Sequence, residues 1–195
     1  MDPKDYYRRA AKEFVKGSIG ADLGTLYAPF LASLPKGARI LDAGCGSGRD
    51  SRIFSELGYD VSAFDASPEM VKLASEHTGL PIAHRGFDDV DEVAVYDGIW
   101  ACASLLHVAQ VDLPNVFQAL ERALKPSGML YASFKEGSGS RTDAKGRYFT
   151  DFSPDQLQAL VGEATGLELQ RMWRSSDVRE ARQNTIWVNG LWRRC

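Results

Sequence analysis

The chain has 195 residues, of which 44% are hydrophobic and 25% charged, so it is long enough to bury its own core and too apolar to be disordered. Its 23 basic and 26 acidic residues give a net charge of -3 at pH 7, which provides no whole-chain attraction to nucleic acid or to an anionic membrane. The longest nearly uncharged apolar run, residues 98–106, has about half the length of a membrane-spanning helix, so no transmembrane segment is predicted.

Two helices are predicted before the first strand. One begins after Asp2 and ends at Gly17, with Tyr7 on its apolar face, and the other covers about residues 21–34. We expect residues 1–36 to form an N-terminal helical cap on a core made by residues 37–195, with the whole chain in a single domain.

Short β-rich runs then alternate with helical patterns, which is typical of βαβ units around a parallel sheet. The predicted strands cover residues 39–42, 60–65, 81–84, 98–103 and 129–134. Ser67 followed by Pro68 is a typical helix start, and Gly58 ends the helix before it. The sequence therefore predicts an α/β fold with a doubly wound, Rossmann-like sheet and helices on both faces.

The pattern changes after residue 135. Residues 136–146 are rich in glycine and serine without apolar periodicity, so we expect a mobile surface loop. Ser153 and Gln156 form a capping box that opens a helix. Two further strands, at about residues 167–173 and 185–192, are joined by a connection too short for a crossover helix, so the last strand should be antiparallel to its neighbour.

The ends of the chain and its cysteines bear on the compartment. The first nine residues lack the basic-then-apolar order of a signal peptide, which predicts a cytoplasmic protein. The three cysteines, Cys45, Cys102 and Cys195, are widely spaced, so we expect reduced thiols with neither a disulfide framework nor a metal site.

A glycine-rich turn follows the first strand and opens a helix, with the spacing Asp42-x-Gly44-x-Gly46-x-Gly48. It places glycine backbone and helix N-terminal N–H groups at the carboxyl end of the strand, where doubly wound sheets bind nucleotides. Asp65 ends the second strand, at the offset from the turn where a carboxylate can accept hydrogen bonds from both ribose hydroxyls. Alternatively, the turn binds nothing and Asp65 is an ordinary residue at a helix entry.

The glycine spacing distinguishes between nucleotides. A dinucleotide fingerprint requires a third glycine where this chain has Arg49, and a long side chain there would crowd the pyrophosphate. The turn instead resembles motif I of the class I S-adenosylmethionine-dependent methyltransferases, and the resemblance covers residues 40–134. Within that superfamily the chain is most similar to small bacterial methyltransferases of the tellurite-resistance or small-molecule type, through residues 44–51, 96–107 and 124–128.

The resemblance implies the strand order 3-2-1-4-5-7-6 and S-adenosylmethionine as cofactor, with S-adenosylhomocysteine as product. By family position, the glycines lie under the methionine and ribose portion, Asp65 holds the ribose, and Ala66 and Met70 flank the adenine. Phe87 stands where the family usually has an acidic adenine contact. The implied cofactor-binding residues are Asp42, Gly44, Cys45, Gly46, Gly48, Asp65, Ala66, Met70, Phe87, Ala101, Cys102 and Ala103.

For the reaction, the resemblance implies an in-line SN2 methyl transfer to a small-molecule acceptor. His107 follows the fourth strand and is the candidate general base, which is needed only for a protonated acceptor. Tyr7 is a second candidate, because the N-terminal helix of related enzymes often folds over the active site. Both residues have an alternative role in packing. The cations at 135, 141, 145 and 147 either contact an anionic acceptor or belong to a solvated loop.

Two other functions stay open at this level. One is an NAD(P)-binding oxidoreductase, which the glycine spacing and the lack of a Tyr-x-x-x-Lys pair disfavour. The other is a non-catalytic module that binds S-adenosylmethionine, which would have a cofactor pocket without room for an acceptor. No basic stripe with interleaved aromatic residues indicates a nucleic-acid partner.

Overall fold

The computed structural model describes residues 17–144, 146–179, 182 and 184–195. The predicted first helix and Tyr7 lie outside this part of the chain. The predicted second helix is present as α2 (Gly24–Leu31), which is shorter than expected and contains Pro29. Among the described residues, none of the helices has the length and apolar character needed to cross a membrane.

Seven strands form the central sheet, in the order β3-β2-β1-β4-β5-β9-β8. Neighbouring strands from β3 to β5 are parallel, whereas β9 is antiparallel to both β5 and β8. The predicted order is confirmed. The strands predicted as the sixth and seventh are labelled β8 and β9 here, because two short strands, β6 and β7, precede them in the chain. The strands are β1 (Arg39–Ala43), β2 (Asp60–Asp65), β3 (Ile82–His84), β4 (Tyr96–Ala101), β5 (Leu124–Lys135), β8 (Leu167–Ser176) and β9 (Ile186–Arg194).

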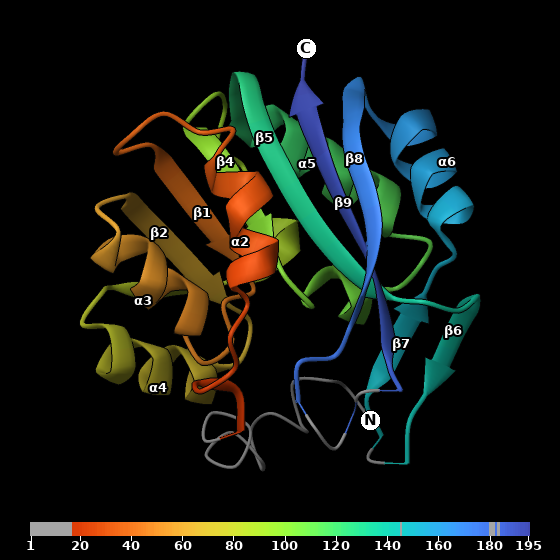
Figure 1. Cartoon of the computed structure of the whole chain (residues 1–195), viewed down its shortest axis with the longest axis horizontal. Helices are drawn as coiled ribbons and strands as arrows, with labels where there is room; N and C mark the ends of the chain where they lie inside the picture. The colour runs from red at the N-terminus through yellow and green to blue at the C-terminus, as the bar shows by residue number, and fades with distance from the viewer. Residues whose placement is uncertain (1–16, 145, 180–181, 183) are drawn as a thin grey trace.

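Helices cover both faces of the sheet, as Figure 1 shows with α2 and α3 in front and α5 behind. Side chains alternate across a strand, so Trp100 and Ile99 of β4 point to opposite faces. Trp100 packs with α2 and α3, whereas Ile99 belongs to the larger core under α5 and α6. The remaining helices are α3 (Arg49–Glu56), α4 (Pro68–Thr78), α5 (Leu113–Ala123), α6 (Pro154–Ala164) and the one-turn η1 (Phe87–Asp89) and η2 (Leu105–His107).

The stretch expected to be a mobile loop forms a hairpin, so that prediction was wrong. Strands β6 (Gly139–Thr142) and β7 (Tyr148–Asp151) pair antiparallel, and they lie beyond the end of β5 (Figure 1). At the base of the hairpin, Glu136 and Phe152 form a β-bridge, so the two ends of this segment lie side by side. Ion pairs from Arg141 to Asp151 and from Arg147 to Asp143 link its residues. Phe149 and Phe152 anchor its second half in the main core, whereas β6 is exposed and polar, so residues 136–146 carry no hydrophobic periodicity.

Candidate functional site

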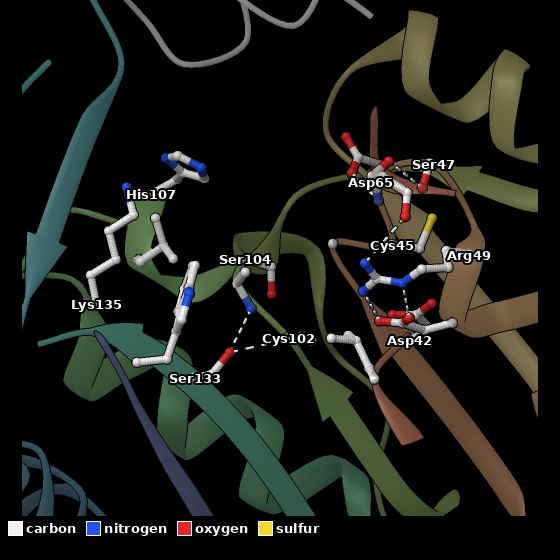
Figure 2. A pocket seen from close by; sticks show the side chains of 18 of the residues that line it. Asp42, Cys45, Ser47, Arg49, Asp65, Cys102, Ser104, His107, Ser133 and Lys135 are labelled. Carbon is white, nitrogen blue, oxygen red and sulfur yellow. Dashed lines mark hydrogen bonds and ion pairs between the residues drawn. The ribbon is translucent and has the colours of Figure 1, made fainter. Parts of the chain in front are cut away.

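A cavity of about 420 Å³ opens at the carboxyl ends of β1, β4 and β5, where open parallel sheets bind ligands. Its size is in the usual range for small-molecule sites. Figure 2 shows Cys45, Ser47 and Asp65 on one side of the cavity and His107 and Lys135 on the other. Residues 44–47 and Asp65 are called the glycine-loop wall. His107 and Lys135, with Phe149 and Arg147 packed against them, are called the hairpin wall.

The glycines of the first wall have different roles. Gly44 and Gly46 line the cavity with positive φ angles of 74° and 56°. A Cβ on Gly44 would lie 2.6 Å from Cβ of Ser104, whose hydroxyl donates to the carbonyl of Ala43. Gly44 therefore keeps the loop close to the segment after β4, which a side chain would prevent.

Gly48 does not line the cavity, contrary to its predicted role. It caps the N-terminus of α3 with a φ of 73°, and a Cβ there would lie 2.6 Å from Cγ2 of Thr78 on α4. Its function is the close approach of α3 to α4. Ala101 is also outside the cavity lining, because it is fully buried inside β4.

Three backbone donors of the loop already have partners within the protein. The N–H groups of Gly44 and Cys45 both donate to the carbonyl of Phe64, at 3.0 and 2.9 Å. The N–H of Gly46 donates to Oδ2 of Asp65 at 2.9 Å. In this structure the N–H groups of residues 44–46 therefore shape the loop, and the two glycines supply room beside it.

Asp65 ends β2 and holds the wall together. Its Oδ1 accepts from the N–H of Ser67 at 2.9 Å, while Oδ2 accepts from Gly46. Burial raises the pKa of Asp65 above its ordinary value, and the bonds from Ser67 and Gly46 oppose that rise. Each carboxylate oxygen has two acceptor positions, so both can take one more hydrogen bond from ligand hydroxyls.

Below the loop lies a buried polar network that the sequence analysis missed. Asp50 accepts hydrogen bonds from Tyr27 at 2.6 Å, from Arg49 at 2.6 Å and from the indole of Trp100 at 2.8 Å. Burial opposes ionisation, yet Arg49 and these donors hold the pKa of Asp50 below its ordinary value. The sequence signal was weak, because Tyr27 and Trp100 are 23 and 50 residues from Asp50.

The pKa of Asp42 is shifted in the opposite direction. Burial, followed by the charge of Asp50, raises its pKa to about 8, and the Ser51 hydroxyl donates to it at 2.5 Å. Asp42 is therefore harder to ionise than Asp50, although both line the cavity. The positive charge of Arg49, which also lines the cavity, is balanced by Asp50.

The segment after β4 forms the floor of the cavity. β4 ends at Ala101, so Cys102 and Ala103 are loop residues that line the cavity. Ala103 has a φ of 52°, which is uncommon for a residue with a side chain, and its N–H donates to the hydroxyl of Ser133 at 2.8 Å. Burial raises the pKa of Cys102 to about 12, and that of Cys45 also rises. Both are thiols rather than reactive thiolates.

His107 lies in η2 on the hairpin wall. Its Nδ1 is 2.8 Å from the carbonyl of Tyr148, and its ring is 4.8 Å from that of Phe149. Burial, with nearby Arg147 and Lys135, lowers its pKa to about 4. The ring is therefore neutral at pH 7, and its proton is on Nδ1 because a carbonyl can only accept. Nε2 is then the basic nitrogen.

The cavity brings together most of the predicted site residues. Phe87 and Met70, which were predicted to lie near the adenine, both line it. Gly48 and Ala101 are outside its lining, and Tyr7 lies outside the described residues. The predicted residues that line it are Asp42, Gly44, Cys45, Gly46, Asp65, Ala66, Met70, Phe87, Cys102, Ala103 and His107. In the described parts of the chain, no group of three His, Cys, Asp or Glu side chains is placed to hold a metal.

A sheet of this order, with a glycine loop after β1 and a carboxylate at the end of β2, defines the class I S-adenosylmethionine-dependent methyltransferase fold. The sequence model of the methyltransferase domain family matches residues 15–174. The chain belongs to this family, and the predicted membership of the class I S-adenosylmethionine-dependent methyltransferase superfamily is confirmed.

Similar proteins include the ubiquinone biosynthesis O-methyltransferase of Xanthomonas axonopodis pv. citri, which is 36% identical over 107 residues, or 51% of this chain and 44% of that protein. The chain thus spans less than half the length of that relative. Among solved structures, 1,6-didemethyltoxoflavin-N1-methyltransferase of Burkholderia thailandensis, with bound S-adenosylhomocysteine, has a TM-score of 0.73 at 23% identity, covering 100% of this chain and 91% of that one. A TehB-like methyltransferase of Corynebacterium glutamicum has a TM-score of 0.70 at 22% identity, covering 99% and 100%. At these identities the two structures support the fold alone.

Proposed function

We propose that this protein transfers a methyl group from S-adenosylmethionine to a small-molecule acceptor by in-line displacement. The observation that carries the proposal is that one cavity extends from Asp65 on the glycine-loop wall to His107 on the hairpin wall. The end at Asp65 has room for the methyl donor, and the end at His107 has room for a methyl acceptor. A non-catalytic module that only binds S-adenosylmethionine would not need the second space, so its presence favours an enzyme.

The residues of the glycine-loop wall fit the cofactor. Asp65 accepts hydrogen bonds from the ribose hydroxyls with its remaining lone pairs, and Gly44 and Gly46 leave room for the chain beside the sugar. Phe87 packs edge-on to Phe64 at 5.4 Å and, with Met70, offers an apolar surface to the adenine.

S-adenosylmethionine supplies an electrophilic methyl group on a good leaving group, so the protein has to align the acceptor and exclude water. His107 is placed to align the acceptor. The Tyr148 carbonyl fixes its ring at the end of the cavity that we assign to the acceptor. With a pKa of about 4, the ring is a weak base, so it orients the acceptor instead of storing its proton.

The names of similar proteins agree with a small acceptor, although they differ in the atom methylated. One is named as an O-methyltransferase of ubiquinone biosynthesis and another as an N1-methyltransferase of didemethyltoxoflavin. An NAD(P)-dependent oxidoreductase is disfavoured, because Arg49 begins α3 where a dinucleotide fingerprint has glycine.

Cofactor binding is tested by calorimetry with S-adenosylhomocysteine and the Asp65→Ala variant. The variant should bind roughly 2–3 kcal/mol more weakly, which is about 30- to 150-fold, because charge-assisted bonds to the ribose are lost. Asp60→Ala is the matched control, since Asp60 begins the same strand and its side chain is exposed. Equal affinities in the two variants would contradict the ribose assignment.

Methyl transfer itself is tested by S-adenosylhomocysteine release with tellurite, selenite, thiols and small carboxylates as acceptors. Release above the hydrolysis background with one of them supports an enzyme. Tight binding of S-adenosylhomocysteine without transfer to any small acceptor would favour the non-catalytic module.

A further inference from the structure

Three cations of the hairpin wall and its surroundings gather around one aromatic ring. Nζ of Lys135 is 3.7 Å from the ring centre of Phe149, and the guanidinium carbons of Arg141 and Arg147 are 4.8 and 5.1 Å from it. Phe149 itself is buried, at 2% exposure. A single cation on one ring is common, whereas three bring like charges together at an energetic penalty.

Two of these cations are neutralised by carboxylates. Arg141 pairs with Asp151, and Arg147 pairs with Asp143 through two of its nitrogens, at 2.6 and 2.9 Å. Among the described residues, no carboxylate lies within ion-pair distance of the Lys135 ammonium. Within the described parts of the chain, Lys135 is therefore the member of this cation cluster without a paired carboxylate.

The other end of the same strand shows what a lysine of β5 does when its role is structural. Lys125 donates to both oxygens of Asp97, each at 2.9 Å, and does not line the cavity. Lys135 lines the cavity and is half-buried. Its burial, followed by the charges of Arg141 and Arg147, lowers its pKa to about 8.

The location of this charge is set by the sheet. Lys135 is the last residue of β5, so its side chain stands at the carboxyl edge beside His107, as Figure 2 shows. Arg147 is buried and lines the same end of the cavity, and Arg182 lines it as well. This end lies across the cavity from Asp65, so its charge faces the acceptor side rather than the ribose side.

We infer that Lys135, with Arg147 behind it, binds an oxyanion group of the methyl acceptor, either a carboxylate on a small organic molecule or an inorganic oxyanion. The inference rests on the proposed function, since it names the class of molecule that the same cavity methylates. The acceptor's negative charge supplies the counter-ion that Lys135 lacks, while His107 faces the neighbouring nucleophilic atom.

The test is calorimetry on the protein saturated with S-adenosylhomocysteine, with benzoate, its uncharged isostere benzamide, and sulfate as probes. The wild type should prefer benzoate over benzamide by at least tenfold. Lys135→Met should reduce that preference to less than twofold, and Lys135→Arg should retain most of it. Lys72→Met is the matched control, because Lys72 is exposed on α4 and outside the cavity lining, and it should behave as the wild type.

The sulfate arm separates the two sources of the oxyanion. Binding of benzoate without competition from sulfate indicates a carboxylate on a carbon skeleton, whereas competition by sulfate indicates that an inorganic oxyanion also occupies the site. A wild type that binds no anion, or a Lys135→Met variant that keeps the preference, would overturn the inference. Affinity for S-adenosylhomocysteine is measured first in every variant. Normal cofactor affinity without anion binding defeats only this inference, whereas absent cofactor affinity defeats the proposed function.

Discussion

The two walls of the cavity are built from different lengths of sequence. The glycine-loop wall takes its residues from one turn and from the end of the next strand, and the hydrogen bonds that join the turn to that strand span about 20 residues, such as Gly46 to Asp65. The hairpin wall collects His107, Lys135 and Phe149 from η2, β5 and β7. The comparison teaches that the donor side of this protein is encoded locally, whereas the acceptor side exists only once distant segments have packed together.

Substitutions at two glycines give the strongest test of the first wall. Gly44→Ala and Gly48→Ala both place a side chain at a positive φ and 2.6 Å from a neighbouring carbon, so each should destabilise the protein by about 3 kcal/mol. Of these two glycines, only Gly44 lines the cavity. Thermal unfolding should therefore show similar losses, and calorimetry should show weaker S-adenosylhomocysteine binding for Gly44→Ala alone.

The predicted difference between these glycines is contradicted if the folded Gly48→Ala variant loses as much affinity for S-adenosylhomocysteine as the Gly44→Ala variant. In that case the packing of α3 on α4 would control the loop, and the wall would extend beyond the residues that line it.

On the hairpin wall, His107 should make stability sensitive to acid. The folded protein takes up the proton only near pH 4, whereas the unfolded chain takes it up near the ordinary pKa of about 6.5. The unfolded state therefore binds more protons between these values, and the free energy of unfolding falls as pH drops from 6.5 to 4, by up to about 3 kcal/mol.

Denaturant unfolding at several pH values checks this effect in the wild type and in His107→Asn, whose amide can still donate toward Tyr148. The difference between the two proteins isolates the histidine, since Asp42 and other titrating groups contribute to both. Parallel pH profiles would show that the ring is accessible to protons in the folded state.

A smaller effect is expected from the titration of Lys135. Burial, Arg141 and Arg147 lower its pKa to about 8, with Asp151 opposing and Arg182 adding to the shift. Because the charged form binds the anion, benzoate affinity should fall by about tenfold between pH 7 and pH 9. In Lys135→Arg the charge persists, so the affinity should stay constant over that range. A wild-type affinity that is equally constant would place the anion away from Lys135.

Much of the fold could be predicted because it depends on local patterns. The bounds of β2 agree residue for residue with the predicted 60–65, and the strand order is as the resemblance implied. For the site, the glycine spacing correctly located Gly44, Gly46 and Asp65 at one cavity. The same spacing includes Gly48, which does not line the cavity, because a positive φ required for helix packing has the same sequence signature as one required for ligand approach.

The remaining features depend on contacts that no local pattern contains. The network around Asp50 needs the approach of Tyr27 and Trp100 from two other elements. The β6–β7 hairpin is joined by ion pairs, and its glycine and serine content resembles that of an unstructured loop. The orientation of the His107 ring depends on a carbonyl 41 residues away, and its neutral state depends on its burial in the assembled fold.

The bridge between Glu136 and Phe152 gives the hairpin a narrow stem, since the segment leaves the sheet and rejoins the path to α6 at nearly the same point. The strands of the hairpin are otherwise tied to the core through Phe149 and Phe152 of its second half, while the first half is exposed. Changes of length or sequence in the exposed half would thus leave the central strands intact while they reshape one side of the cavity.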